Sequence, residues 1–205
     1  GYTFSGWSGS GVTDTGAAST TVTMTSDRSV SASFNLNSHA LALTAGTGGT
    51  VSGGGSYGYG TSASISATPN TGYTFNGWSG SGVTDSGAAS TTVSMTADRS
   101  LSASFNLNTH SLSLRAGTGG TVSGGGSYGY GTSANITATA NEGYVFSGWN
   151  GEGVTDASKA NTTVSMIVDR GLYANFELSI VELSFASPSG GQLSGAGKYL
   201  SLIHI

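Results

Sequence analysis

Three near-copies of one string decide the fold of this chain: GYTFSGWSGSGVTD at residues 1–14, GYTFNGWSGSGVTD at 72–85 and GYVFSGWNGEGVTD at 143–156. The copies begin 71 residues apart, and Gly1–Asn37 differs from Gly72–Asn108 at only five positions. A catalytic site is normally built once per chain, whereas a unit copied nearly unchanged supplies length, valency or both. The repetition therefore argues against an enzyme before any motif is considered.

The 71-residue period also predicts how the chain is divided. We expect a truncated repeat at 1–37, complete repeats at 38–108 and 109–179, and the first part of another repeat at 180–199. Each truncated unit lacks its other half, so we expect frayed or wrongly paired strand edges there. Residues 200–205 match what a common sequencing adapter encodes when read through in one frame, and we hypothesise that they are an artefact. Uninterrupted genomic DNA encoding them would contradict this hypothesis.

The composition disfavours several classes of partner. A net charge of −4 with 8% charged residues provides no basic surface for nucleic acid or for an anionic membrane. No apolar run reaches the roughly 18–20 residues that a membrane-spanning helix needs, so we expect no membrane insertion of this fragment. The chain has no cysteine, which removes disulfides and thiolate metal sites.

The hydrophobic pattern has a period of two, which is typical of half-buried strands. Val93 and Met95 alternate with Thr and Ser, and Leu101, Ala103 and Phe105 alternate with serines. No window carries the spacing of an amphipathic helix. We therefore expect an all-β fold of tandem 71-residue modules with five or six short strands each, at 41–45, 50–52, 56–67, 73–78, 91–96 and 100–105.

Aromatic residues are the largest candidates for the core, because each buries ~150–250 Å² when enclosed. Four of them recur in each complete repeat, and we assign them to the core of a small sandwich or a grasp-like sheet. They are Tyr73, Phe75, Trp78 and Phe105 in one repeat, and Tyr144, Phe146, Trp149 and Phe176 in the next.

The motifs around these aromatics resemble a known family. GYTFNGW at 72–78 is preceded by Gly-Gly-Thr-Val at 48–51 and Tyr59-Gly60, and followed by VSMTADRSLSASF at 93–105. This pattern is similar to the divergent InlB (internalin) B-repeat family, which is related to the Listeria–Bacteroides repeats. The resemblance covers nearly the whole chain. It implies β-rich modules, some resembling a β-grasp, in extracellular or surface-anchored bacterial proteins, and it implies no catalytic residues.

Repeated tyrosines are the one candidate binding site. Tyr57 and Tyr59 alternate onto one face of a glycine-flanked strand, and Tyr128 and Tyr130 repeat them. Exposed aromatic pairs can stack on sugar rings, with nearby hydroxyls for hydrogen bonds. The alternative, which we favour, is that these rings pack on the core.

Other motifs carry less chemistry. The Gly53–Gly60 loop lacks the lysine and the following helix of a phosphate loop, so we expect no nucleotide or other cofactor. Asp85 and Asp98 recur in each unit but lie 13 residues apart, which favours turn capping over a metal site. His39 and His110 have Val181 as their third counterpart, so a histidine-dependent catalytic triad would not survive along the array.

Together these features predict a non-catalytic spacer or stalk segment of a secreted or cell-surface bacterial protein, supporting adhesion. The alternative is a multivalent module that binds carbohydrates or host surfaces through the repeated tyrosines. Expected partners are the neighbouring repeats and, for the alternative, cell-surface glycans or host surface proteins.

Overall fold

All regular secondary structure in the described part of the chain is β. A computed structural model describes residues 1–183, 195 and 197–200. Its strands are β1 (Tyr2–Ser8), β2 (Ser31–Leu36), β3 (Ser38–Ala45), β4 (Gly49–Ser52), β5 (Gly55–Gly58), β6 (Thr61–Pro69), β7 (Tyr73–Ser79), β8 (Ser90–Met95), β9 (Arg99–Leu107), β10 (Thr109–Ala116), β11 (Gly120–Ser123), β12 (Gly126–Gly129), β13 (Thr132–Ala140), β14 (Tyr144–Asn150), β15 (Asn161–Met166), β16 (Arg170–Leu178), β17 (Ile180–Leu183) and β18 (Gly197–Leu200). The chain forms two compact units, Gly1–Asn106 and Leu107–Ile205.

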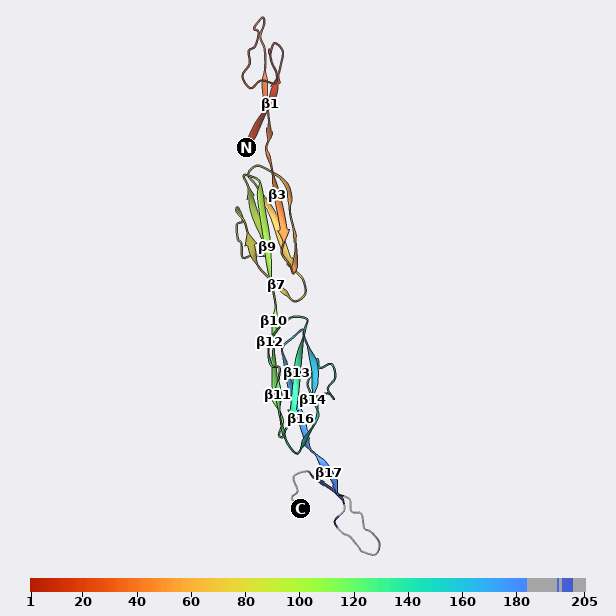
Figure 1. Cartoon of the computed structure of the whole chain (residues 1–205). Helices are drawn as coiled ribbons and strands as arrows, with labels where there is room; N and C mark the ends of the chain where they lie inside the picture. Colours follow the sequence, from red (N-terminus) through yellow and green to blue (C-terminus); the bar gives the residue numbers. More distant parts are fainter. Residues whose placement is uncertain (184–194, 196, 201–205) are drawn as a thin grey trace. The chain divides into compact units, whose positions relative to one another are not determined.

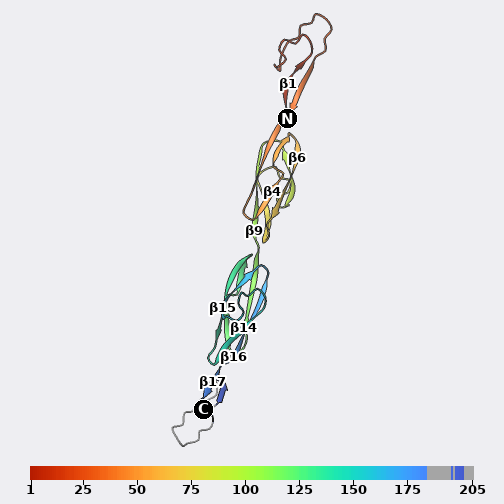
Figure 2. The same cartoon turned by 90° about the vertical axis from the view of Figure 1, so that its right-hand side faces the viewer.

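Each complete repeat consists of two sheets. The first repeat has a four-stranded sheet in the order β5-β3-β9-β7 and a three-stranded sheet in the order β4-β6-β8. The second repeat has the same arrangement, with β12-β10-β16-β14 and β11-β13-β15. Figures 1 and 2 show the first repeat from two sides, with β3, β7 and β9 labelled in one view and β4 and β6 in the other. The all-β prediction is confirmed.

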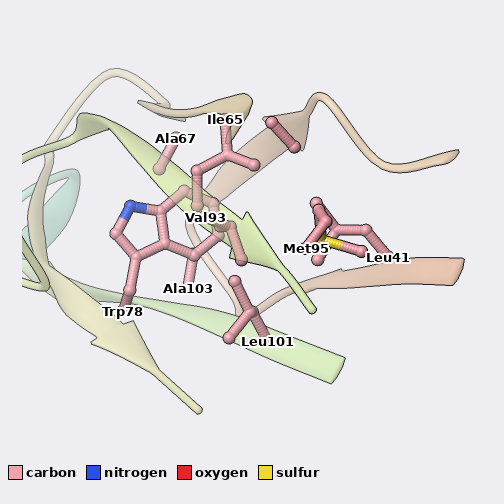
Figure 3. Close-up of a cluster of buried hydrophobic side chains, with 9 residues drawn as sticks. Leu41, Ile65, Ala67, Trp78, Val93, Met95, Leu101 and Ala103 are labelled. Carbon is pink, nitrogen blue, oxygen red and sulfur yellow. The ribbon is translucent and has the colours of Figure 1, made fainter. Parts of the chain in front are cut away.

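The core of each repeat lies between its two sheets. Strands β3, β7 and β9 of one sheet and β6 and β8 of the other supply Leu41, Ala63, Ile65, Ala67, Trp78, Val93, Met95, Leu101 and Ala103 (Figure 3). Met95 and Val93 are 0% exposed, and the inward positions of β6 are filled by alternate residues, as a half-buried strand requires. Ser and Thr occupy the outward positions between them. The second repeat has the same core residue types at the same positions.

The aromatic residues that we assigned to the core differ in their burial. Trp78 and Trp149 are each 6% exposed, whereas Phe75 and Phe105 are half-buried and pack against the cluster. Tyr73 is also half-buried, and its ring lies over Gly48. The deepest positions belong to aliphatic residues and methionine.

Two consecutive glycines make room for these aromatic rings. A Cβ added to Gly48 would lie 2.1 Å from the Tyr73 ring, and one added to Gly49 would lie 2.2 Å from the Phe105 ring. The Gly-Gly-x-Val motif is thus explained by the close approach of backbone to aromatic ring.

The first and last strands of each repeat are parallel neighbours at the centre of the larger sheet. In the first repeat Leu41 pairs with Arg99 and Ala45 pairs with Ala103. Because the two strands run the same way, β9 continues beyond the end of β3 toward Leu107. The other described strand pairs are antiparallel. The first and last residues of the repeat therefore lie at opposite ends of the larger sheet, along the direction of its strands.

Each complete repeat has seven strands, more than the five or six that we expected. The sequence suggested one long strand at 56–67, but the structure has β5 and β6 separated by Tyr59 and Gly60. Gly60 has a φ of 79°, a left-handed conformation that interrupts an extended strand. Alternating residues on both sides of this turn concealed it.

The truncated unit at 1–37 retains part of the fold. Its strands β1 and β2 pair in register, with an irregularity between Phe4 and Gly6 that matches the one between Phe146 and Gly148. We expected frayed or wrongly paired edges: the β1–β2 pairing has the register of the complete repeat, whereas residues 20–24 form no strand. At the other end, β17 and β18 form an antiparallel pair. Residues 201–205, the greater part of the expected artefact, lie outside the described residues.

Candidate functional site

The repeated tyrosines lie near the first strand of each complete repeat. Tyr57 belongs to β5 and pairs across the sheet with His39, whereas Tyr59 follows β5 in the turn before β6. A single residue, Asn37, separates β2 of the truncated unit from β3. The sequence-predicted pair is thus divided between a strand and a turn.

Tyr57 is directed toward the protein interior. Its ring packs against the core cluster, and its hydroxyl donates a hydrogen bond to the Gly53 carbonyl at 2.7 Å. Tyr128 does the same with the Gly124 carbonyl at 2.7 Å. The ring of each tyrosine thus packs on the core, as in the alternative that we favoured, and its hydroxyl in addition anchors the glycine-rich loop.

Tyr59 is more accessible and contacts the preceding unit. Its side chain is 42% exposed, and its ring centroid lies 6.0 Å from that of His39. Its backbone N–H donates to the Asn37 carbonyl at 2.7 Å, and its ring lies over Gly1, where an added Cβ would be 2.4 Å from the ring. Tyr59 thus fills the junction between the truncated unit and the complete repeat.

The counterpart in the second unit has the same local contacts. The Tyr130 N–H donates to the Asn108 carbonyl at 2.8 Å, and the ring centroid lies 6.1 Å from that of His110. Tyr130 is half-buried. The repeated tyrosine, histidine and asparagine therefore form one recurring group.

A histidine–aspartate pair lies beside each of these tyrosines. His39 Nδ1 is 3.2 Å from Asp98 Oδ1, and the Ala40 N–H donates to the same carboxylate at 2.9 Å. The Ala40 N–H, and then the His39 hydrogen bond, hold the pKa of Asp98 below its ordinary value. The carboxylate joins β3 to the turn before β9, which explains why this aspartate recurs.

The second repeat reproduces the pair. His110 Nδ1 is 3.3 Å from Asp169 Oδ1, and the Ser111 N–H donates to that oxygen at 2.8 Å. The Ser111 N–H is the main cause that lowers the pKa of Asp169, with a smaller effect from His110. No serine hydroxyl completes a triad with either pair among the described hydrogen bonds.

The remaining candidate residues have local roles. Asp85 caps its own loop, accepting the Gly87 N–H at 2.9 Å, as the sequence suggested. Among the described residues, His, Asp and Glu side chains form no group of three or more that could hold a metal ion. Within the same residues, no helix is long and apolar enough to cross a bilayer.

Comparison with known proteins identifies the repeat. The family model described as the divergent InlB B-repeat domain matches residues 1–38, 39–109 and 110–180. No curated protein and no solved structure matches the chain. The three matches follow the 71-residue period and contain the aromatic and glycine positions that the fold explains. The chain belongs to the divergent InlB B-repeat family, a repeat domain of surface proteins.

Proposed function

We propose that this segment is a non-catalytic spacer in a secreted or cell-surface bacterial protein, where it holds an adhesive or other functional domain away from the envelope. The observation that carries the proposal is the parallel pairing of β3 and β9, with Leu41 opposite Arg99. A repeat whose first and last strands are parallel neighbours begins and finishes at opposite ends. Length is therefore added with each copy.

The register gives the size of the increment. Ser38 lies three residues before Leu41 along β3, and Asn106 lies seven residues after Arg99 along β9, so ten residues of strand separate their levels. At roughly 3.3 Å per residue, the repeat spans about 33 Å between these two levels. An array of such repeats would extend in steps of this order.

The join between units favours a fixed step. Only Asn37 lies between β2 and β3, so the first junction has no flexible linker. The Asn37 N–H donates to the Gly1 carbonyl at 2.8 Å, and the Asn37 carbonyl accepts from Tyr59. The side chain of Leu36 approaches Gly58, where an added Cβ would meet its Cδ2 at 2.7 Å. These contacts support a spacer rather than a flexible tether.

A series of arrays with increasing numbers of repeats tests the spacer proposal. Arrays of two, three, four and five complete repeats, each copied from 38–108, are compared by small-angle X-ray scattering. We expect the maximum dimension to rise by roughly 33–43 Å per added repeat, because the next copy begins three residues beyond the equivalent of Asn106. A dimension that levels off as repeats are added would contradict the proposal, because the array would then fold back on itself.

A second candidate function is multivalent binding of glycans or host-surface proteins. The observation that favours it is the 42% exposure of Tyr59 at a position that recurs as Tyr130. Weak sites repeated along an array gain avidity. Because Tyr57 and Tyr128 pack inward, Tyr59 and Tyr130 are the residues of the original four that would contact such a ligand.

A glycan and polysaccharide binding panel separates the two functions. The parent chain is compared with a Tyr59→Ala, Tyr130→Ala variant, and with a Tyr57→Phe, Tyr128→Phe control that retains the inward rings. Binding by the parent and the control, but not by the alanine variant, would establish an adhesive module. Absence of binding by a folded parent would leave length as the function.

A further inference from the structure

The two complete repeats share their core but differ on the outer face of the larger sheet. In the first repeat the outward positions concerned carry Ala42, Thr44, Ser79, Ser100 and Ser102. The second repeat replaces all five, in the same order, with Ser113, Arg115, Asn150, Gly171 and Tyr173. These five replacements surround a single hollow of about 310 Å³.

Strand register explains why these side chains meet. Arg115 of β10 and Asn150 of β14 both pair with Tyr173 of β16, so the three form one row across three neighbouring strands. Neighbouring strands lie roughly 4.8 Å apart, so the row extends over about 9.6 Å from Arg115 to Asn150, with Tyr173 at its centre. Ser113 pairs with Gly171 in the next row on the same face.

Gly171, which lies with Ser113 in the next row, leaves open space beside the row of Arg115, Asn150 and Tyr173. A Cβ added to Gly171 would meet no atom within 4 Å, so the hollow is open above it. Tyr173 borders the hollow with a ring that is 42% exposed and that leans toward Gly117. Gly117 lies on the opposite side of Tyr173 from Gly171, so the ring leaves the space above Gly171 open and stays accessible beside it.

The polar groups around the hollow have unused hydrogen-bonding capacity. Within the described residues, no hydrogen bond or ion pair engages the side chains of Ser113, Arg115, Asn150 or Tyr173. The first repeat differs, because there the Ser79 hydroxyl donates to the Ser102 carbonyl at 3.3 Å. Four polar side chains of the second repeat therefore converge on the hollow without internal partners.

We propose that this hollow binds a uronic acid unit of an acidic polysaccharide. An aromatic ring packs on the C–H face of a pyranose, as Tyr173 would do. The planar guanidinium of Arg115 matches a carboxylate through two parallel N–H donors. Asn150 and Ser113 supply donors and acceptors for ring hydroxyls. The site is present in one repeat and is independent of the recurring tyrosines and of the spacer role.

The surrounding charge orients the ligand. Glu152, Asp169 and Arg170 line a neighbouring hollow that shares Gly151 and Gly171 with this one. Arg170 is engaged within the protein, because its Nε donates to the Ser165 carbonyl at 2.7 Å. Asp169 lies four residues before Tyr173 on the chain, whereas Arg115 is directly opposite Tyr173. The carboxylate of a bound uronic acid therefore points toward Arg115 and away from the two acidic side chains.

Affinity electrophoresis of the 205-residue chain in gels containing polygalacturonate tests the proposal. The chain carries a net charge of −4, so a polyanion attracts it little without a specific site. We expect retardation by polygalacturonate and at least tenfold weaker binding to its fully methyl-esterified form. Equal binding of the two polymers, or no retardation by polygalacturonate, would overturn the proposal.

The first repeat supplies the substitutions for this test. Arg115→Thr, Tyr173→Ser and Gly171→Ser each install the residue found at the equivalent position of the first repeat, so the fold tolerates them. Each should weaken binding at least tenfold. The control is Val145→Thr, an exposed position of β14 that also restores the residue of the first repeat, and it should leave binding unchanged. Variants that bind as well as the parent would overturn the assignment.

The reverse transfer asks whether the five residues suffice. Ala42→Ser, Thr44→Arg, Ser79→Asn, Ser100→Gly and Ser102→Tyr are introduced together into the first repeat. Calorimetric titration with a galacturonate oligomer should then show two sites per chain in place of one. A stoichiometry that stays at one, with the circular dichroism spectrum unchanged, would contradict the proposal.

Discussion

The truncated unit at 1–37 and the complete repeat at 38–108 have nearly the same sequence over their shared part but bury different amounts of it. Met95 is 0% exposed, whereas its counterpart Met24 is 69% exposed. Phe105 packs against the core, whereas Phe34 is 58% exposed. Identical residue types therefore have different environments, and the cause lies outside the shared sequence.

Some elements form in both regions and others only in one. The pairing of β1 with β2, bulge included, forms without any strand equivalent to β3–β6. By contrast, residues 20–24 form no strand, although their counterparts belong to β8. Strand β8 pairs with β6, with Ala63 opposite Val93, and the truncated unit has no such partner in this chain. The hairpin is local, whereas the second sheet and the core depend on the half-repeat at 38–71.

Adding the missing half to the truncated unit should have the largest effect. A copy of residues 38–71 placed directly before Gly1 supplies the equivalents of β3–β6. We expect Met24 and Phe34 to become buried, each contributing ~1.5–3 kcal/mol. Hydrogen exchange of the amides at 20–24 should slow strongly, because a strand forms there. The control is a scrambled insert of the same composition; equal exchange with both inserts would contradict the account.

The same substitution in the two regions should give unequal results. Met95→Ala removes a fully buried side chain and should lower the free energy of unfolding by about 2–5 kcal/mol. Met24→Ala should change it by less than about 0.5 kcal/mol, since the side chain is exposed. Urea unfolding followed by tryptophan fluorescence measures both. Similar losses for the two variants would show that Met24 is buried in solution.

The glycine beneath Phe105 offers a smaller perturbation. Gly49→Ala places a Cβ 2.2 Å from the Phe105 ring, so the ring must move toward the exposed state of Phe34. We expect a loss of about 1–3 kcal/mol in thermal or urea unfolding. Gly87→Ala is the matched control, because its Cβ meets only Asp85 Oδ1 at 3.5 Å and the next repeat has Ser158 there. An unchanged free energy of unfolding in Gly49→Ala would contradict the packing described for the Gly-Gly motif.

The effect of Asp98→Asn on thermal stability should depend on pH, whereas that of Asp27→Asn should not. The lowered pKa of Asp98 means that its contribution to stability is present above the unfolded value of about 3.9 and is lost as pH falls through the folded value. Asp98→Asn should therefore reduce the melting temperature at pH 7 and have little effect near pH 2. Asp27→Asn should have little effect at either pH, because Asp27 has no counterpart of Ala40. Equal pH profiles for both variants would contradict the assigned role.

Much of the fold followed from the sequence. The period of two placed the strands, and the 71-residue spacing identified the repeat that the family match bears out. Of the aromatic residues assigned to the core, Trp78 is 6% exposed, whereas Phe75 and Phe105 are half-buried. The split of the expected strand at Tyr59–Gly60 was missed, because alternation continues on both sides of the turn. The depth of Met95 and Leu101 was also underestimated, since size alone does not indicate which residues lie between two sheets.

The candidate site was less predictable. Alternation indicated that Tyr57 and Tyr59 share a face, but the Tyr59–Gly60 turn and the hydrogen bond to Gly53 separate their surroundings. The row of Arg115, Tyr173 and Asn150 was invisible before the strand register was known, because these residues are far apart in sequence. The sequence did carry one signal for this site: the outward strand positions differ between two copies that are otherwise similar.

The central claim is that a repeat begins and finishes at opposite ends, and a distance within one repeat tests it most directly. The chain has no cysteine, so Ser38→Cys and Asn106→Cys introduce a unique pair of sites for spin labels. Double electron–electron resonance should give a narrow distribution near 33 Å, allowing a few ångströms for the label arms. A mean distance below about 20 Å, as two ends on the same side would give across a few strands, would contradict the account.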